Sequence, residues 1–369
     1  GVGGGIIMVP LLMLWARMDQ RQAAATSLVA IVPTAVAGAT TYGIAGEIDL
    51  VAAALVGAGA FGEKHLDGLT RIEGAEIISV ISREADKAAE IAAKYGARHS
   101  GTELEDALAL DDVDAVILCT PTQMHARQAI ACMDAGKHVE VEIPVADSWA
   151  DAQAVIAKQQ ETGLVCMVGH TRRFNPSHQW VKNRIDAGEF TIQAMDVQTF
   201  FFRRENTNAK GEPRSWTDHL LWHHSAHTID IFQYMTGAKV VQANILQGPK
   251  HPKLGIAMDQ SIQMKTDQGQ ILTLALSFNN DGPLGTFFRY IGDTGTYIAR
   301  YDDLVDGREE PIDVSEVDVS MNGIELQDRE FLSAIHDGRE PNSSIASVLD
   351  CYRVIGELAQ SLEAQDGWS

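Results

Sequence analysis

A glycine-rich turn that follows an apolar run constrains this chain more than any other feature. The run Val51–Val56 has the composition of a buried parallel strand and leads into Gly57-Ala58-Gly59-Ala60-Phe61-Gly62. In a G-x-G-x-x-G turn, the glycines permit a tight bend, close approach of a pyrophosphate and close packing of helix on strand. A helix beginning near Phe61 would offer free N–H groups to phosphates. We therefore predict a dinucleotide-binding loop whose cofactor contacts are Gly57, Gly59, Ala60, Phe61 and Gly62.

The segments that follow this loop alternate between strand and helix patterns. We expect strands at Glu76–Ile81, Ala115–Cys119 and His138–Val141, with helices at Ala85–Tyr95 and Gln123–Ala135 that end at Gly96 and Gly136. Such alternation predicts an α/β fold with a doubly wound parallel sheet, the Rossmann domain, over residues 51–170.

The end of the second strand bears on the choice of cofactor. An acid at this place binds the ribose 2′-OH of NAD, whereas an arginine accommodates the 2′-phosphate of NADP. Here Ser82 and Arg83 follow the strand, and no carboxylate stands at its end. We predict NADP, held by Ser82 and Arg83. The alternative, in which Arg83 stacks on adenine and NAD also binds, stays open.

Residues 1–50 differ in composition from the rest of the chain. They carry five charged side chains, and residues 22–46 carry none, which is enough to cross a bilayer. The segments GVGGGIIMVPLL and AAATSLVAIVPTAVAG resemble the TauE/SafE family of permeases. Because this resemblance covers about one repeat unit, we interpret residues 1–50 as a fusion or an assembly artefact. A membrane anchor, with membrane contact, is one alternative, and a disordered segment or stray helices are another.

Three further segments carry a second resemblance. These are Thr120-Pro121-Thr122 with His125, then Glu142-Ile143-Pro144, then a helical pattern with His227 and Asp230. Their order resembles the Gfo/Idh/MocA oxidoreductase family over roughly residues 52–369. The resemblance implies further cofactor contacts at Thr120, Pro121, Thr122, His125 and Glu142.

The same resemblance implies a second domain, residues 171–369, that binds substrate and ends in helices. It would contain an open, mostly antiparallel sheet that supports the active site and a homodimer contact. Alternation of apolar side chains predicts strands at Val240–Leu246, Ser261–Lys265, Ile271–Ser277 and Thr286–Ile291.

Longer segments, among them GHTRRFNPSH and KGEPRSWTDHLLWHH, are similar to members that act in aromatic compound degradation. Those members oxidise the cyclic hemiacetal of a carboxylated semialdehyde to a pyrone dicarboxylate with NADP, in the 4,5-cleavage of protocatechuate. Two positions depart from the wider family: Ile143 replaces a lysine, and His223 replaces an aspartate. Both changes suit an anionic substrate better than a sugar. A sugar or polyol dehydrogenase and a non-catalytic NADP-binding protein remain the alternatives.

Histidines on one predicted helix, Thr217–Thr236 closed by Gly237, are the candidates for proton transfer. His219, His223 and His227 recur every four residues, and Asp230 follows one turn later. Removing a proton from a hemiacetal hydroxyl needs a base that titrates near neutral pH. We predict His227 as this base, with His223 and Asp230 as further catalytic candidates. The spacing would also permit a zinc site, although we expect no metal.

Basic side chains elsewhere are candidates for binding a carboxylated substrate. Arg172 and Arg173 follow the predicted strand end at Val165–Gly169, where ligands bind in open α/β sheets. The full set of predicted substrate contacts is His170, Arg172, Arg173, His178 and Arg214.

The overall charge and the cysteines limit the class of protein. The formal net charge of −21 argues against nucleic acid as a partner. Cys119, Cys132, Cys166 and Cys351 are scattered and form no C-x-x-C pair, which fits a reducing cytoplasm.

Overall fold

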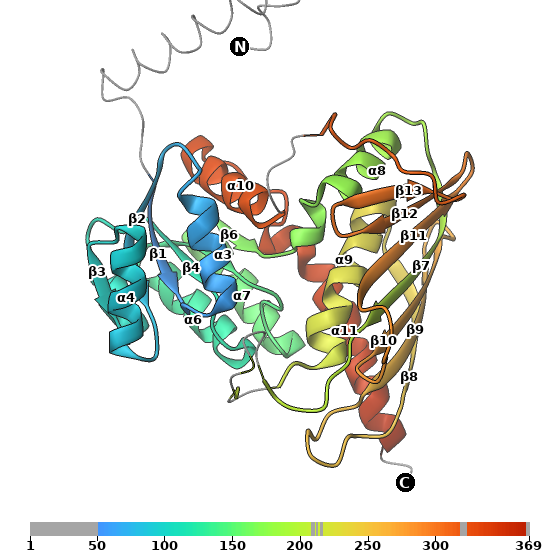
Figure 1. Ribbon diagram of the computed structural model, residues 1–369, viewed down its shortest axis with the longest axis horizontal. Coiled ribbons are helices and arrows are strands. Elements are labelled where there is room, and N and C mark those ends of the chain that lie inside the picture. Colours follow the sequence, from blue (N-terminus) through green and yellow to red (C-terminus); the bar gives the residue numbers. More distant parts are fainter. Residues whose placement is uncertain (1–50, 208–210, 212, 215–216, 318–322, 367–369) are drawn as a thin grey trace, which may run out of the picture. The chain divides into compact units, whose positions relative to one another are not determined.

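Two β-sheets organise the part of the chain that the computed structural model describes (Figure 1). The described residues are 51–207, 211, 213–214, 217–317 and 323–366. The permease-like segment 1–50, with the interpretations attached to it, lies outside them. Among the described residues, no helix combines the length and the apolar character that crossing a membrane requires.

The first sheet is the parallel sheet that the sequence predicts. Its six strands lie in the order β3-β2-β1-β4-β5-β6, and every neighbouring pair is parallel. The strands are β1 (Val51–Val56), β2 (Ala75–Ile81), β3 (His99–Gly101), β4 (Ala115–Leu118), β5 (His138–Val141) and β6 (Cys166–Val168). Alternate residues of β1 enter two separate hydrophobic clusters, so both of its faces are buried. This explains its uninterrupted apolar run. The sequence analysis did not predict the short edge strand β3.

Five helices accompany this sheet. They are α3 (Ala60–Leu69), α4 (Ala85–Tyr95), α5 (Leu104–Leu108), α6 (Thr122–Asp134) and α7 (Trp149–Thr162). The predicted bounds of α4 are confirmed, and the helix ends because Gly96 takes the left-handed conformation at φ 77°. The prediction for α6 is one residue late at both ends.

The second sheet has seven strands in the order β13-β12-β11-β7-β10-β9-β8. The strands are β7 (Ile192–Phe200), β8 (Val240–Gln247), β9 (Asp259–Thr266), β10 (Ile271–Ser277), β11 (Gly285–Gly292), β12 (Thr296–Arg300) and β13 (Asp303–Asp306). Only β7 and β10 pair in parallel, which confirms a mostly antiparallel sheet. In β9 and β10, buried side chains alternate with more exposed ones, so one face of the sheet packs inward.

Short helical turns and four longer helices complete the described chain. They are η1 (Thr171–Arg173), α8 (Pro176–Asp186), η2 (Leu220–His224), α9 (Ser225–Thr236), α10 (Gly323–Asp337) and α11 (Ile345–Asp366). In Figure 1, α8, α9 and α11 lie on the same side of the second sheet, between it and the first. The predicted helix Thr217–Thr236 is wrong at its start. Its first described helical residue is Leu220, and a π-helical turn precedes the α-helix.

The C-terminal helices return to the first sheet. Helix α10 packs on α3 so closely that a Cβ at Gly68 would lie 2.9 Å from Asp328 Oδ2. At the edge strand β6, Val168 N donates to Ser343 O, and Met167 forms an antiparallel bridge with Ser344. Helix α10 and the segment that follows it therefore pack on α3 and β6. This packing brings side chains from the C-terminal part of the chain to the carboxyl ends of the parallel strands.

Candidate active site

The glycine loop leaves space on the side where a pyrophosphate would bind. Gly57 has φ 103°, and a Cβ there would lie 2.5 Å from Cys119 O. A Cβ at Gly62 would lie 2.3 Å from Gly57 O, whereas one at Gly59 would meet no atom within 4 Å. Gly59 is also the N-cap of α3 and offers no side chain to its N–H groups. The loop therefore fits the requirements of a dinucleotide, with close packing at two glycines and open backbone at the third.

The end of β2 lies beside this loop. Gly57 N donates to Ile81 O at 2.9 Å, and Ser82 N donates to Gly101 O at 3.1 Å. The buried Ser82 and the exposed Arg83 thus follow the strand next to the glycine turn. In the first turn of α3, the Phe61 ring is 55% exposed and adjoins Ala60. All these predicted cofactor contacts lie in one neighbourhood.

The loop after β4 is tied to the loop after β5 by one histidine. His125 Nδ1 is 2.7 Å from Pro144 O, and Nε2 is 2.7 Å from Thr120 O. Pro121 is the N-cap of α6, and Thr122 is its first residue. Burial lowers the pKa of His125. His125 therefore holds two loops together, a role that the resemblance did not imply.

Glu142, at the carboxyl end of β5, is held by residues from three distant segments. Its Oε1 atom accepts from His65 Nε2 at 3.1 Å and from Gln327 Nε2 at 3.2 Å. A Cβ at Gly169 would lie 2.7 Å from the same oxygen, so this position requires glycine. The side chain of Glu142 is 13% exposed.

Behind Glu142 lies a buried polar cluster that the sequence analysis missed. His65 Nδ1 is 2.7 Å from Asp328 Oδ1, and Gln327 Nε2 donates to Glu140 Oε1 at 2.7 Å. Burial raises the pKa of Glu140 well above its usual value and that of Asp328 to about 6. The one available signal was Glu140, an acid inside a strand predicted to be buried.

The histidines of η2 and α9 do not share the regular face that the sequence predicts. His219 precedes the helix as its N-cap, and its Nδ1 accepts from Leu221 N at 3.2 Å. The π-turn brings His223 and His224 together, with ring centroids 5.1 Å apart. Burial lowers the pKa of His223 to about 4 and that of His227 well below its usual value.

Asp218, two residues before η2, binds several basic side chains. Its carboxylate accepts from Arg203 Nη2 at 2.7 Å and from Arg214 Nη1 at 2.6 Å. Burial would raise the pKa of Asp218, but His224, His223 and the two guanidinium groups lower it strongly. Among the described residues, nothing accepts a hydrogen bond from the buried Nη1 atom of Arg203, so this atom could donate to a ligand.

A second basic group surrounds Arg172. Its Nη1 donates to Asn175 Oδ1 at 3.2 Å, and its guanidinium lies 5.1 Å from the Tyr301 ring centroid. Nearby, the buried His178 hydrogen-bonds the Tyr290 hydroxyl through Nδ1. Within the part of the chain that the structure describes, neither the buried Nε of Arg172 nor the Nε2 of His178 has a hydrogen-bond partner. Burial and the charge of Arg172 lower the pKa of His178.

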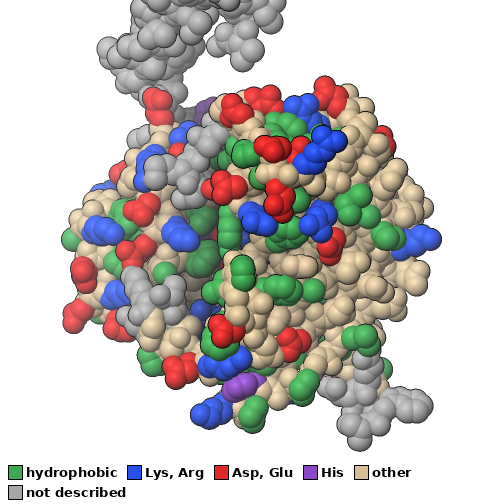
Figure 2. All heavy atoms as spheres, turned by 45° about the vertical axis from the view of Figure 1, so that its right-hand side comes forward, with side chains coloured by type: hydrophobic (Ala, Val, Ile, Leu, Met, Phe, Trp, Pro, Cys, Tyr) green, Lys and Arg blue, Asp and Glu red, His purple; other side chains and the backbone are tan. Residues whose placement is uncertain are grey.

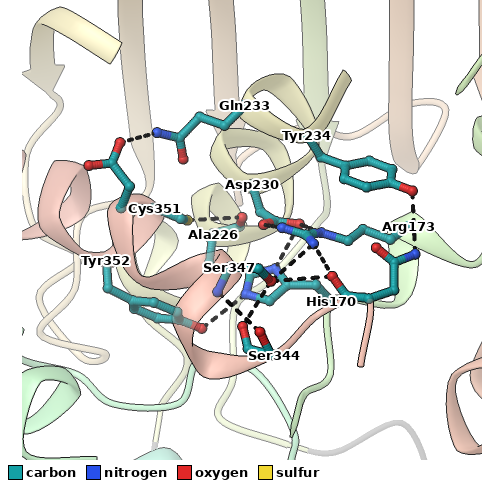
Figure 3. Close-up of polar contacts among 12 residues, drawn as sticks. His170, Arg173, Ala226, Asp230, Gln233, Tyr234, Ser344, Ser347, Cys351 and Tyr352 are labelled. Atoms are coloured by element: carbon teal, nitrogen blue, oxygen red, sulfur yellow. Dashed lines mark hydrogen bonds and ion pairs between the residues drawn. The ribbon is translucent and has the colours of Figure 1, made fainter. Parts of the chain in front are cut away.

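Arg173, although adjacent to Arg172, belongs to a different network (Figure 3). Its guanidinium donates through Nε and Nη2 to both oxygens of Asp230 and through Nη1 to Asn342 O. His170 is enclosed in the same network, with Nδ1 3.4 Å from Asp230 Oδ2 and Nε2 3.2 Å from the Tyr352 hydroxyl. Asp230, which the sequence had suggested as a further catalytic candidate, thus pairs with Arg173 instead. Both ring contacts of His170 and most guanidinium contacts of Arg173 are therefore made within the protein.

Within the described residues, two groups bring potential metal ligands within 4.8 Å of one another. These are Asp218 with His223 and His224, and His65 with Glu140 and Asp328. Asp218 is already paired with two guanidinium groups, and both ring nitrogens of His65 face carboxylates. Neither group includes His219 or His227, so the three-histidine arrangement that the spacing would permit is not among them.

On the face that Figure 2 shows, acidic and basic side chains are interspersed among the described residues. The cationic groups around Arg172 and Asp218 are therefore local features of an acidic protein, whose formal net charge is −21.

Comparison with known proteins matches both sheets to one group of enzymes. Residues 51–170 match the oxidoreductase family with an NAD-binding Rossmann fold, and residues 176–318 match the C-terminal domain of bacterial oxidoreductases. The chain is 77% identical over 312 residues to 4-carboxy-2-hydroxymuconate-6-semialdehyde dehydrogenase of Sphingobium sp.. That match covers 85% of this chain and 99% of the relative. The chain belongs to the Gfo/Idh/MocA oxidoreductase family. It is a dehydrogenase that uses a nicotinamide cofactor.

Solved structures show the same fold. UDP-N-acetylglucosamine 3-dehydrogenase from Acidithiobacillus ferrooxidans superimposes with a TM-score of 0.71 at 23% identity, covering 85% of this chain and 98% of that one. An aldose-aldose oxidoreductase from Caulobacter crescentus gives a TM-score of 0.75 at 19% identity, covering 86% and 98%. Residues 1–62 match the sulfite exporter TauE/SafE family, and this match overlaps the Rossmann match over residues 51–62.

Proposed function

We propose that this Gfo/Idh/MocA enzyme oxidises the cyclic hemiacetal of 4-carboxy-2-hydroxymuconate-6-semialdehyde to 2-pyrone-4,6-dicarboxylate. The product is that of the 4,5-cleavage route of protocatechuate breakdown. The observation that carries the proposal is the 77% identity to a dehydrogenase named for this semialdehyde, over 99% of that relative's length. The two cationic groups of the site support it, because the compound carries two carboxylates.

We infer that the cofactor is NADP. Ser82 and Arg83 follow β2 beside the glycine loop, and no acid stands at the end of that strand. A serine hydroxyl and a guanidinium group suit a 2′-phosphate, whereas a carboxylate would repel it. The open backbone at Gly59 would hold the pyrophosphate.

We propose that one carboxylate of the substrate binds the cationic group around Arg172 and the other binds the cationic group around Asp218. Arg172, with His178 beside it, supplies donors in the first group. Arg203 and Arg214, positioned by Asp218, supply cations in the second. His227 lies near enough to Arg172, and to His170, His223 and His224, for these groups to lower its pKa, so it adjoins both cationic groups. We no longer assign Arg173 and His170 to the substrate, because Asp230 and Tyr352 engage them.

His227 would accept the proton of the hemiacetal hydroxyl. Oxidation breaks the C–H and O–H bonds of one carbon centre and leaves the lactone C=O, and the nicotinamide, when bound, supplies the acceptor for the hydride. Burial and the neighbouring cations lower the pKa of His227, so it is uncharged at neutral pH and free to take a proton. A bound dianion would raise that pKa again and strengthen the base.

The test is turnover by the full chain with NADP⁺ and the ring-cleaved product of protocatechuate, followed by NADPH absorbance. We expect turnover with this substrate and none with inositol, and a loss of about 10²-fold or more in kcat for His227→Ala. His99→Ala, on the edge strand β3, is the matched histidine control and keeps the wild-type rate. No turnover by the wild type would refute the substrate, whereas a nearly full rate for His227→Ala would refute only the base.

We also propose a homodimer in the cytoplasm, joined through the outer face of the second sheet. Exposed apolar side chains on β8 and β10, namely Val241, Leu246 and Ile271, support an interface there. Light scattering after size exclusion should give twice the chain mass. Leu246→Glu should shift the mass toward that of one chain, and a monomeric wild type would contradict the proposal.

A further inference from the structure

The histidine behind Glu142 is a buried cation. His65 is fully buried, with Nδ1 2.7 Å from Asp328 Oδ1 and Nε2 3.1 Å from Glu142 Oε1. An ionised carboxylate accepts hydrogen bonds and donates none, so each ring nitrogen must carry a proton to make both contacts. The ring therefore bridges the two carboxylates as an imidazolium.

The acids around this cation differ in charge. Burial would lower the pKa of His65, but Asp328 raises it well above its usual value. Burial would likewise raise the pKa of Glu142, but the hydrogen bond and charge of His65 lower it. Burial and Asp328 raise the pKa of Glu140 well above its usual value, which favours its neutral form. One cation thus serves two carboxylates, and Glu142 is the one that reaches the site.

Two further contacts fix the position of Glu142. Gln327 Nε2 donates to its Oε1 atom, and Gln327 Oε1 accepts from Thr171 Oγ1 at 2.9 Å, so the amide cannot turn freely. Gly169 lies against the same oxygen. Because His65, Gln327 and Gly169 all hold Oε1, the other carboxylate oxygen is the one left for a ligand.

The position of Glu142 places this charge where hydride transfer would occur. Glu142 is held from α3, the helix of the glycine loop, and it also acts electrostatically on His223 of the opposite domain. Glu142 thus adjoins both the helix of the glycine loop and the histidines of η2, the two elements between which a nicotinamide ring would meet the substrate.

We propose that His65, held by Asp328, keeps Glu142 ionised beside the nicotinamide, so that the site binds the oxidised cofactor more tightly than the reduced one. The inference rests on the binding of a nicotinamide dinucleotide and does not depend on the substrate. The oxidised ring carries a positive charge and the reduced ring is neutral, so a fixed carboxylate attracts only the first. His65, Asp328 and Gln327 act through Glu142 and are positioning residues.

The test is the ratio of the dissociation constants of NADP⁺ and NADPH, measured by fluorescence titration and competition between pH 6.5 and 9. Both forms carry the same phosphates, so phosphate titration cancels in the ratio, and NAD⁺ with NADH serves equally well. For Glu142→Gln we expect the ratio to rise about tenfold, which corresponds to 1.4 kcal/mol, and to be independent of pH. An unchanged ratio in this isosteric variant would overturn the proposal.

His65→Gln separates control of charge from support of the fold. Without the imidazolium, Glu142 would face Asp328, Glu140 and Cys119 in a buried environment, with His125, His170 and His223 as its remaining basic neighbours. Its pKa should rise, so we expect the ratio to rise about tenfold near pH 6.5 and return toward the wild-type value near pH 9. The double variant should behave as Glu142→Gln alone.

His99→Gln is the matched control, because His99 pairs with Ser79 on the far edge of the sheet. It should keep the wild-type ratio at every pH. If His65→Gln weakened both cofactor forms equally at every pH, His65 would have only a structural role and the proposal would fail. If His65→Gln did not fold, Glu142→Gln would still decide whether the carboxylate discriminates between the two forms.

Discussion

At the scale of single residues, the adjacent arginines Arg172 and Arg173 make different kinds of contact. Arg172 keeps a buried Nε without a partner, whereas Arg173 gives its guanidinium to Asp230 and to a backbone carbonyl. The sequence placed both beside the same strand end and could not separate them. The difference arises because η1 turns successive side chains in different directions, one toward Tyr301 and the other between α9 and α11.

This difference predicts opposite phenotypes for two adjacent substitutions. Arg172→Gln should raise KM for the carboxylated substrate, because a bidentate cationic contact is lost, with little change in stability. Arg173→Gln should lower the free energy of unfolding by about 3 kcal/mol, because it leaves Asp230 as an unpaired buried charge. Urea titrations and steady-state kinetics of both variants provide the measurement. Equal loss of stability in the two would contradict the assignment.

Cofactor choice is also decided by single side chains. Arg83→Ala should lower kcat/KM for NADP⁺ by about tenfold or more, because the 2′-phosphate loses a charge-assisted hydrogen bond. The value for NAD⁺ should change little. An unchanged NADP⁺ constant would instead assign Arg83 to stacking on adenine, the alternative that the sequence left open.

At the scale of elements, the candidate cofactor and proton-transfer residues lie at the beginnings of helices. The first turn of α3 faces the cofactor loop, and the π-turn η2 rearranges the histidines that precede α9. A π-turn adds a residue to the helical repeat, so residues four apart no longer align across it. For this reason the regular spacing of His219, His223 and His227 did not predict their arrangement.

The glycine loop offers a matched pair of substitutions. Gly59→Ala should fold with wild-type stability but bind cofactor at least tenfold more weakly, because its Cβ meets no protein atom and fills the space for the pyrophosphate. Gly62→Ala should destabilise the protein, because its Cβ would lie 2.3 Å from Gly57 O. Thermal melting and NADPH fluorescence distinguish the two effects. Wild-type cofactor affinity in Gly59→Ala would contradict the assignment of the loop.

At the scale of the whole described molecule, the last two helices complete a site that begins near the glycine loop. Gln327 and Asp328 of α10 reach His65, Glu140 and Glu142. Helix α11 supplies Ser347 and Tyr352 to the network around Arg173 and His170. Stability and the site therefore depend on the same long-range contacts.

Buried histidines should make the protein less stable in mild acid. Burial lowers the pKa of His170 and of His223 to about 4, below the value near 6.5 in an unfolded chain. The unfolded state then binds more protons between pH 6.5 and 4, so stability is complete above pH 6.5 and falls as the pH drops, by about 1.4 kcal/mol per pH unit for each histidine.

Urea titrations from pH 7 to 5 measure this slope. His65 acts in the opposite sense, because its pKa is raised and its contribution is lost only as the pH rises through that value. His170→Gln should reduce the slope by about 1.4 kcal/mol per pH unit. Because the raised pKa values of Asp328 and Glu140 act in the opposite direction, the wild-type slope alone does not decide the matter, and a slope that His170→Gln left unchanged would contradict the assignment of His170 as neutral.

The sequence by itself determined the parallel sheet, the glycine loop, the mostly antiparallel second sheet and the family. These depend on local spacing, since buried strands need apolar runs and a pyrophosphate turn needs glycine at fixed positions. Only the tertiary structure decided which charged side chains face a ligand. His65, Glu142 and Asp328 meet across 263 residues of separation, and Arg173 meets Asp230 across 57. No local pattern encodes such contacts, because the packing of α10 and α11 against the earlier elements creates them.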